Sequence, residues 1–188
     1  MLICREEKKS SKKNKFILAG LIITFAVLAF YYNSRIDDSR YDVIIEKAAK
    51  RHNVDSRFIK AVIYQESKFD SEARGAAGEI GLMQIMPDGA AVDWAKHYKF
   101  DNICHGLLFG PELNIEIGTW YLSKALKRWK NYKHVKELAL CQYNAGSKRA
   151  NVWKPENYNG TVIDRIKIKS TRAYVEAIMH KYNRYCEK

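Results

Sequence analysis

The sequence predicts an α+β fold that is mainly α-helical, with a small hairpin region in the folded domain and one transmembrane helix before it. Three observations lead to this expectation. Apolar residues recur at helical spacing through most of the chain from residue 41 onward. A stretch at 67–80 that is rich in Gly, Ala and charge interrupts that pattern, as a loop or small hairpin does. Residues 16–32 form an uncharged, apolar run, and a helix of that length rises about 26 Å, close to the thickness of a hydrocarbon core.

The N-terminal segment predicts export of everything that follows it. Residues 1–15 form a basic tail that should stay cytoplasmic, because Lys and Arg beside an apolar helix favour that side. Two interpretations of 16–32 remain open: an uncleaved membrane anchor, which its length favours, or a signal segment cleaved near the small residue Ala29. In both, a linker at 33–40 leads to a folded domain at 41–188 in the extracytoplasmic or periplasmic space.

Length and charge limit the classes of protein to consider. The 188 residues allow one domain of ordinary size plus an anchor, and 47% hydrophobic content indicates a globular fold. The net charge is +12, of which residues 1–35 carry +5 and residues 36–188 carry +7. A basic surface suits nucleic acid, anionic lipid or an anionic wall polymer. Export makes nucleic acid an unexpected partner.

Helical periodicity and breaker residues predict the individual elements of the domain. Pro111 suits the first turn of a helix, and Gly146 suits a helix end. Helices are expected at 41–52, from 55 or 56 to 66 or 67, and at 87–98, 111–129, 134–143 and 171–185. Residues 99–110 should be irregular, and residues 147–169 should be mixed, because Pro155 and Gly160 interrupt them.

The cysteines and histidines predict no metal site and no cofactor. The exported part contains Cys104, Cys141 and Cys186, so it can form at most one internal disulfide. Cys141 lies in an apolar helical pattern and is expected to be a small buried hydrophobe. The sequence contains no paired Cys-x-x-Cys and no His-Glu-x-x-His spacing.

Glu66 is the first candidate for a catalytic residue. It ends a predicted helix whose Val62 and Ile63 are apolar, and a Gly-rich loop follows. The negative end of the helix dipole and partial burial both disfavour a charged carboxylate. Both effects raise the pKa of Glu66 toward the value that a general acid needs near neutral pH. A surface Glu at a helix end is the alternative interpretation.

Two short motifs follow Glu66 along the chain. The segment Gly81-Leu82-Met83-Gln84 combines close backbone approach, apolar side chains and an amide that both donates and accepts. Those groups suit a pocket for an N-acetylated sugar. Tyr143 and Asn144 come about 60 residues later, before a Gly. Each motif alone could be a turn or a core feature.

In this order the motifs resemble the soluble-lytic-transglycosylase (SLT-type) family of lysozyme-like peptidoglycan lytic transglycosylases. The resemblance covers roughly residues 41–185 and also includes the long central helix at 114–122 and Tyr174. It implies a lysozyme-like helical domain with Glu66 as the catalytic acid/base. It also implies a set of substrate-binding residues: Ser67, Gly81, Leu82, Met83, Gln84, Tyr143, Asn144 and Tyr174. Tyr143 would lie close to Glu66, and Tyr174 would close the far side of the cleft.

Three positions depart from the pattern of this family. Gln142 stands where Ala is common, Ser170 stands where Glu is frequent, and the spacing of 75–80 differs. Ser170 puts one polar sugar contact in doubt, and the altered spacing puts the hairpin over the cleft in doubt. The core of the motif set is unaffected.

The resemblance implies that peptidoglycan glycan strands are cut between N-acetylmuramic acid and N-acetylglucosamine, leaving a 1,6-anhydro ring. Two alternatives remain. A second carboxylate, with Glu79 as the best candidate, would make the protein a goose-type-like lysozyme that hydrolyses the bond. A module that binds the wall without cutting it would keep the groove and need no acid.

Overall fold

The computed structural model describes residues 14–25, 27–28, 37–101 and 103–187. The chain divides into two compact units, residues 1–37 and residues 38–188. In the first unit, residues 14–25 are helical. The predicted anchor at 16–32 and the linker at 33–40 lie partly outside the described residues. Within the described ranges, no helix is both long enough and apolar enough to span a bilayer.

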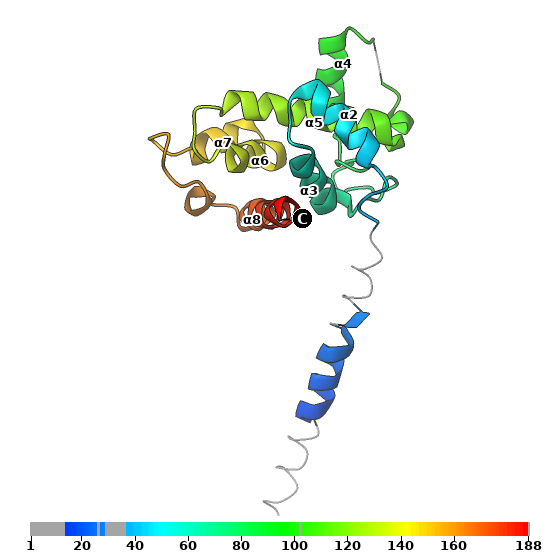
Figure 1. Cartoon of the computed structure of the whole chain (residues 1–188), viewed down its shortest axis with the longest axis vertical. Coiled ribbons are helices and arrows are strands. Elements are labelled where there is room, and N and C mark those ends of the chain that lie inside the picture. The colour runs from blue at the N-terminus through cyan, green and yellow to red at the C-terminus, as the bar shows by residue number, and fades with distance from the viewer. Residues whose placement is uncertain (1–13, 26, 29–36, 102, 188) are drawn as a thin grey trace, which may run out of the picture. The chain divides into compact units, whose positions relative to one another are not determined.

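The second unit is built from helices joined by turns and by longer loops at 68–86 and 154–168 (Figure 1). In chain order they are α2 (Asp42–His52), α3 (Ser56–Ser67), a π-helical turn η1 (Pro87–Ala91), α4 (Val92–Tyr98), a 3-10 turn η2 (His105–Phe109), α5 (Pro111–Arg128), α6 (Val135–Ala145), α7 (Ser147–Trp153), a 3-10 turn η3 (Ile163–Arg165) and α8 (Lys169–Cys186). The helices expected near 41–52, 56–67, 87–98, 111–129, 134–143 and 171–185 are confirmed to within a few residues.

The α+β expectation was wrong in its β part. No strand occurs in the portion of the chain that the structure describes; the hairpin region contains two isolated antiparallel bridges, Arg74 with Ile80 and Ile80 with Ile85. Ile80 and Ile85 exchange both backbone hydrogen bonds, at 3.0 and 2.9 Å. The pairing stops there because Gly81 and Gln84 both adopt positive φ and turn the chain sharply between the two isoleucines.

The end of α6 and the segment after it also differ from expectation. Helix α6 continues through Asn144 and Ala145, which were expected to break it after residue 143. The helix α7 was expected only as mixed structure. Gly146 has φ +84° and ends α6. Ala150 and Trp153 of α7 are then buried at helical spacing, which stabilises a second short helix.

Helix α3 runs through the core and carries Glu66 to its end. Phe58, Ile59 and Val62 have no exposed surface, and α3 packs against both α2 and α8. Asp55 caps the start of α3 by accepting a hydrogen bond from the Arg57 backbone N–H at 2.9 Å. The chain leaves α3 through Lys68 in the left-handed region. The last turn of α3 therefore lies where core and loop meet.

Candidate active site

Glu66 lies in the last turn of α3, partly buried, and contacts a tyrosine from the far end of the chain. The Tyr174 hydroxyl on α8 donates to Glu66 Oε1 at 2.5 Å. Burial raises the pKa of Glu66 to about 7, the Tyr174 hydrogen bond lowers that pKa, and the charge of Glu79 raises it. Burial outweighs the hydrogen bond, so near neutral pH this carboxyl group can both release and accept a proton.

Tyr143 on α6 supplies a second phenol beside Glu66. Its hydroxyl donates to the Met83 backbone carbonyl at 2.9 Å, and its ring lies edge-on to Tyr121 of α5 with centroids 5.7 Å apart. Burial, and then the Glu66 charge, raise the pKa of Tyr143 well above 10, so its hydroxyl stays protonated. Tyr143 therefore lies near Glu66, as expected, but the hydrogen bond to Glu66 comes from Tyr174.

The loop at 80–84 is held by one buried side chain, Asn114 of α5. Asn114 has no exposed surface; its amide donates to the carbonyls of Ile80 at 2.8 Å and Leu108 at 2.7 Å. Its carbonyl accepts from the Met83 backbone N–H at 2.8 Å. Gly81 is required here, because a Cβ at this position would lie 2.5 Å from Asn114 Nδ2.

The side chains of this loop have different surroundings. Leu82 and Met83 have no exposed surface, and the Leu82 carbonyl and both Met83 backbone groups are bound within the protein, so neither residue lines an open groove. Gln84 is partly exposed and donates to the Gly81 carbonyl at 2.9 Å. A Cβ added at Gly75 would lie 2.1 Å from Glu79 Oε2 and 2.7 Å from Gln84 Oε1, so Gly75 leaves room for both side chains.

Ser67 and Asn144 tie neighbouring elements together. The Ser67 hydroxyl donates to the Leu82 carbonyl at 2.9 Å and so joins the end of α3 to the loop. The Asn144 side chain accepts from the Thr171 hydroxyl at 2.8 Å and so joins α6 to α8. Both contacts position the elements that carry Glu66, Tyr143 and Tyr174.

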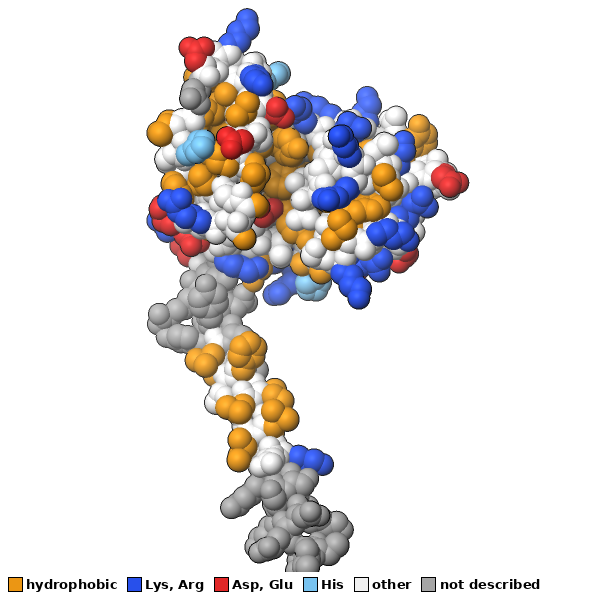
Figure 2. Space-filling view, turned by 180° about the vertical axis from the view of Figure 1, so that it is seen from behind, with side chains coloured by type: hydrophobic (Ala, Val, Ile, Leu, Met, Phe, Trp, Pro, Cys, Tyr) orange, Lys and Arg blue, Asp and Glu red, His pale blue; other side chains and the backbone are white. Residues whose placement is uncertain are grey.

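The structure thus brings together Glu66, Tyr174, Tyr143 and the Met83 backbone from four separate segments. Figure 2 shows a hollow between the lobe that carries α4 and the lobe that carries α6 to α8, with hydrophobic side chains along it. Sequence reasoning did not single out Asn114 or Tyr121. The signal for Asn114 is a polar residue beside the apolar positions of a long helix.

Comparison with known proteins identifies the family. The transglycosylase SLT domain matches residues 43–165. Membrane-bound lytic murein transglycosylase E of Buchnera aphidicola (subsp. Baizongia pistaciae) is 31% identical over 157 residues, which cover 77% of this chain and 69% of the relative. Soluble lytic murein transglycosylase of Escherichia coli K12 is 29% identical over 153 residues, covering 77% of this chain and 23% of the relative.

Solved structures of lytic transglycosylases superpose on this chain. Lytic transglycosylase Slt of Pseudomonas aeruginosa, an inactive Glu-to-Gln mutant, superposes with TM-score 0.69 at 27% identity over 79% of this chain and 24% of that one. The 70 kDa soluble lytic transglycosylase in complex with bulgecin A superposes with TM-score 0.71 at 25% identity over 95% of this chain and 29% of that one. This chain thus spans less than a third of the soluble enzymes it matches.

The chain belongs to the transglycosylase SLT domain family. The predicted family and the predicted enzyme class, peptidoglycan lytic transglycosylase, are both confirmed.

Proposed function

We propose that this protein is a membrane-bound lytic transglycosylase that cuts peptidoglycan with Glu66 as its single acid/base. The observation that carries the proposal is a partly buried carboxyl group with a pKa of about 7 and a phenol hydrogen-bonded to one oxygen. Because Tyr174 occupies Oε1, Oε2 is the oxygen available to a substrate. A pKa near 7 allows the same group to act first as acid and then as base.

The chemistry needs no second carboxylate. Protonated Glu66 donates to the glycosidic oxygen between N-acetylmuramic acid and N-acetylglucosamine. The acetamido oxygen of the muramoyl sugar stabilises the positive anomeric carbon. Ionised Glu66 then takes the proton from the 6-hydroxyl of that sugar, which closes the 1,6-anhydro ring. No water is consumed, and Glu66 returns to its protonated state.

The remaining predicted residues have supporting roles in this proposal. Tyr174 holds the Glu66 carboxyl in one orientation, and Tyr143 fixes the Met83 carbonyl beside it. Ser67 and Asn144 hold the surrounding elements in place. Gln84 offers its amide to the glycan, whereas Gly81, Leu82 and Met83 are buried and keep the loop in its shape. Support for these roles comes from the hydrogen bonds of Tyr174, Tyr143, Ser67 and Asn144.

One observation favours a second candidate, a hydrolase. Glu79 lies close enough for its charge to raise the pKa of Glu66. A carboxylate that held a water opposite Glu66 would make the enzyme hydrolyse the glycosidic bond. The anomeric configuration would be inverted, and the product would carry a reducing end. The Ala77 backbone N–H already donates to Glu79 Oε2 at 3.0 Å, which holds that carboxylate in the loop. We therefore favour the transglycosylase.

We also propose that residues 16–32 attach the enzyme to the membrane, with the catalytic domain outside the cytoplasm. The helix at 14–25 and the apolar, uncharged sequence support this. Two of the relatives described as membrane-bound, transglycosylases E and C, match this chain at 31% identity. An anchored enzyme should stay in the membrane fraction after alkaline carbonate extraction. Release by carbonate would contradict the anchor.

The decisive experiment is mass spectrometry of peptidoglycan digested with the full chain in detergent micelles. Muropeptides ending in 1,6-anhydro rings, absent from a digest with the Glu66→Gln protein, would establish the proposed reaction. Products heavier by one water would establish hydrolysis and direct attention to Glu79. Anhydro products from the Glu66→Gln protein would refute the role of Glu66.

A further inference from the structure

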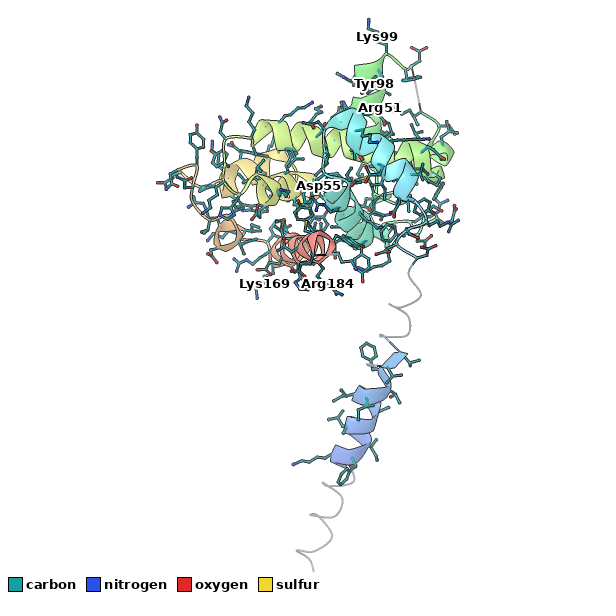
Figure 3. The ribbon with its side chains drawn as sticks, viewed as in Figure 1. Arg51, Asp55, Tyr98, Lys99, Lys169 and Arg184 are labelled. Atoms are coloured by element: carbon teal, nitrogen blue, oxygen red, sulfur yellow. The ribbon has the colours of Figure 1, made fainter. Side chains whose placement is uncertain are left out.

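A second hollow lies among α2, α4 and α5 and plays no part in the proposed reaction. Its volume is about 340 Å³, within the range of small-ligand sites. Its lining includes Arg51 of α2, Tyr98 of α4, and Trp120, Lys124 and Lys127 of α5. Figure 3 labels Arg51 and Tyr98 close together, at the end of the domain that carries α4.

The lining carries positive charge and no carboxylate. Glu116 lies near it with its side chain 12% exposed, but its two oxygens are already bound by Arg51 at 2.8 Å and by His52 at 2.7 Å. Within the described ranges, neither Lys124 nor Lys127 forms an ion pair with a carboxylate. The hollow therefore concentrates unneutralised positive charge, which attracts an anion.

The cationic groups in the hollow indicate which kind of anion it can bind. Arg51 Nη1 donates to Glu116, whereas Lys124 and Lys127 form no such ion pair in the described ranges, so their ammonium groups are the cations offered to a ligand. A Lys ammonium binds phosphate as a compact point charge. Two ammonium groups in one hollow suit a phosphoryl group, because its oxygens accept hydrogen bonds from several directions.

The remaining wall is aromatic. The His97 ring lies 4.8 Å from the Tyr98 ring and 5.4 Å from the Trp120 ring, and Lys124 Nζ lies 4.2 Å from the Trp120 ring centroid. Tyr98 and His97 are exposed, so the flat rings can contact the carbon skeleton of a polyol or sugar. Charge and rings together match a phosphate ester of such a polyhydroxy compound.

The hollow and the candidate active site use different faces of α5. Trp120 and Lys124 face the hollow, whereas the Tyr121 ring contacts Tyr143 beside Glu66. Successive residues of a helix point about 100° apart. A ligand in the hollow can therefore remain bound while a glycan strand occupies the cleft. We propose that this hollow is a binding site for a polyol phosphate, separate from the catalytic cleft.

The first test is calorimetric titration of glycerol 3-phosphate into the full chain held in phosphatidylcholine nanodiscs. We expect saturable binding that glycerol does not reproduce. The double variant Lys124→Gln/Lys127→Gln should weaken binding at least about tenfold, because it removes both free ammonium groups. Both lysines are exposed, so their replacement leaves the core unchanged.

The matched control is Lys148→Gln/Lys169→Gln, which removes the same charge from exposed positions on α7 and α8. Figure 3 shows Lys169 at the opposite side of the domain from Arg51. The control should bind as the unaltered protein does. Equal weakening in the two double variants would reveal diffuse charge attraction and overturn the proposal, as would the absence of saturable binding.

Nanodiscs containing phosphatidylglycerol distinguish the two sources of the same chemistry. If this lipid weakens the binding of glycerol 3-phosphate, the natural ligand is a lipid headgroup. If binding is unchanged, the ligand is a soluble or wall-borne polyol phosphate. Either result supports the site once the lysine variants have behaved as expected.

Discussion

At the residue scale, the raised pKa of Glu66 couples folding to pH. The folded state holds the carboxyl proton more tightly than the unfolded chain does, because the pKa rises from 4.5 to about 7. The contribution of Glu66 to stability is therefore greatest below pH 4.5 and falls as pH rises to about 7, where Glu66 ionises in the folded state.

Replacing Glu66 with Gln removes this pH dependence. Above pH 7 the Glu66→Gln protein should be more stable by about 3 kcal/mol, and near pH 4 the difference should vanish. Urea unfolding at the two pH values measures both differences. The matched control Glu72→Gln, at an exposed position, should show no such change. A Glu66→Gln protein without a pH-dependent gain would mean that burial of Glu66 is not costly.

The two tyrosines at the site should have separable effects. Tyr174→Phe removes the hydrogen bond that lowers the pKa of Glu66, so that pKa should rise above about 7. The alkaline limb of the kcat/KM profile should move to higher pH, and turnover should fall about tenfold or more.

Tyr143→Phe is the comparison for that pH profile. It removes the hydrogen bond to the Met83 carbonyl and should cost about 1 kcal/mol of stability. Turnover should fall, but the alkaline limb should stay in place, because the Tyr174 bond to Glu66 remains. Identical pH profiles for the Tyr174→Phe and Tyr143→Phe proteins would contradict a specific role for Tyr174.

At the element scale, replacing Gly78 or Gly81 with Ala measures the cost of backbone strain separately from the cost of a steric collision. Gly78 and Gly81 both have positive φ, at +95° and +76°. A Cβ at Gly78 would meet nothing within 4 Å, whereas a Cβ at Gly81 would lie 2.8 Å from the Leu108 carbonyl oxygen.

Gly78→Ala should therefore cost about 1 kcal/mol from backbone strain alone. Gly81→Ala adds the collision with Asn114 and Leu108 and should cost at least about 2 kcal/mol more. Chemical denaturation of the two variants checks the difference. If the two variants lose the same free energy of unfolding, the Asn114 side chain can move aside at no free-energy cost.

At the scale of the whole molecule, the net charge of +7 on residues 36–188 predicts salt-sensitive attachment to the wall. Sedimentation of the Glu66→Gln protein with isolated peptidoglycan measures binding without cutting. The bound fraction should fall as ionic strength rises from about 0.01 M to about 1 M, because the screening length falls from about 30 Å to about 3 Å. Unchanged binding would exclude an electrostatic role for the basic surface.

The sequence by itself determined most of the helices, the family and the position of Glu66 at a helix end. The helices and the place of Glu66 depend on neighbours three or four residues apart, and such local periodicity is visible in one chain. The family was recognised from the order of short motifs along the chain. Burial of Cys141 was predicted in the same way and is confirmed. Helix α7 was missed because Ala150 and Trp153 are stabilised by packing rather than by local sequence signals.

Tertiary structure alone decided which groups meet at the site. Tyr174 reaches Glu66 across 108 residues of sequence, and Asn114 holds a loop more than 30 residues away. It also buried Leu82 and Met83 completely and reduced the expected hairpin to two bridges. Burial, hydrogen bonding and pKa depend on atoms that lie close in space, and that proximity exists only after the chain has folded.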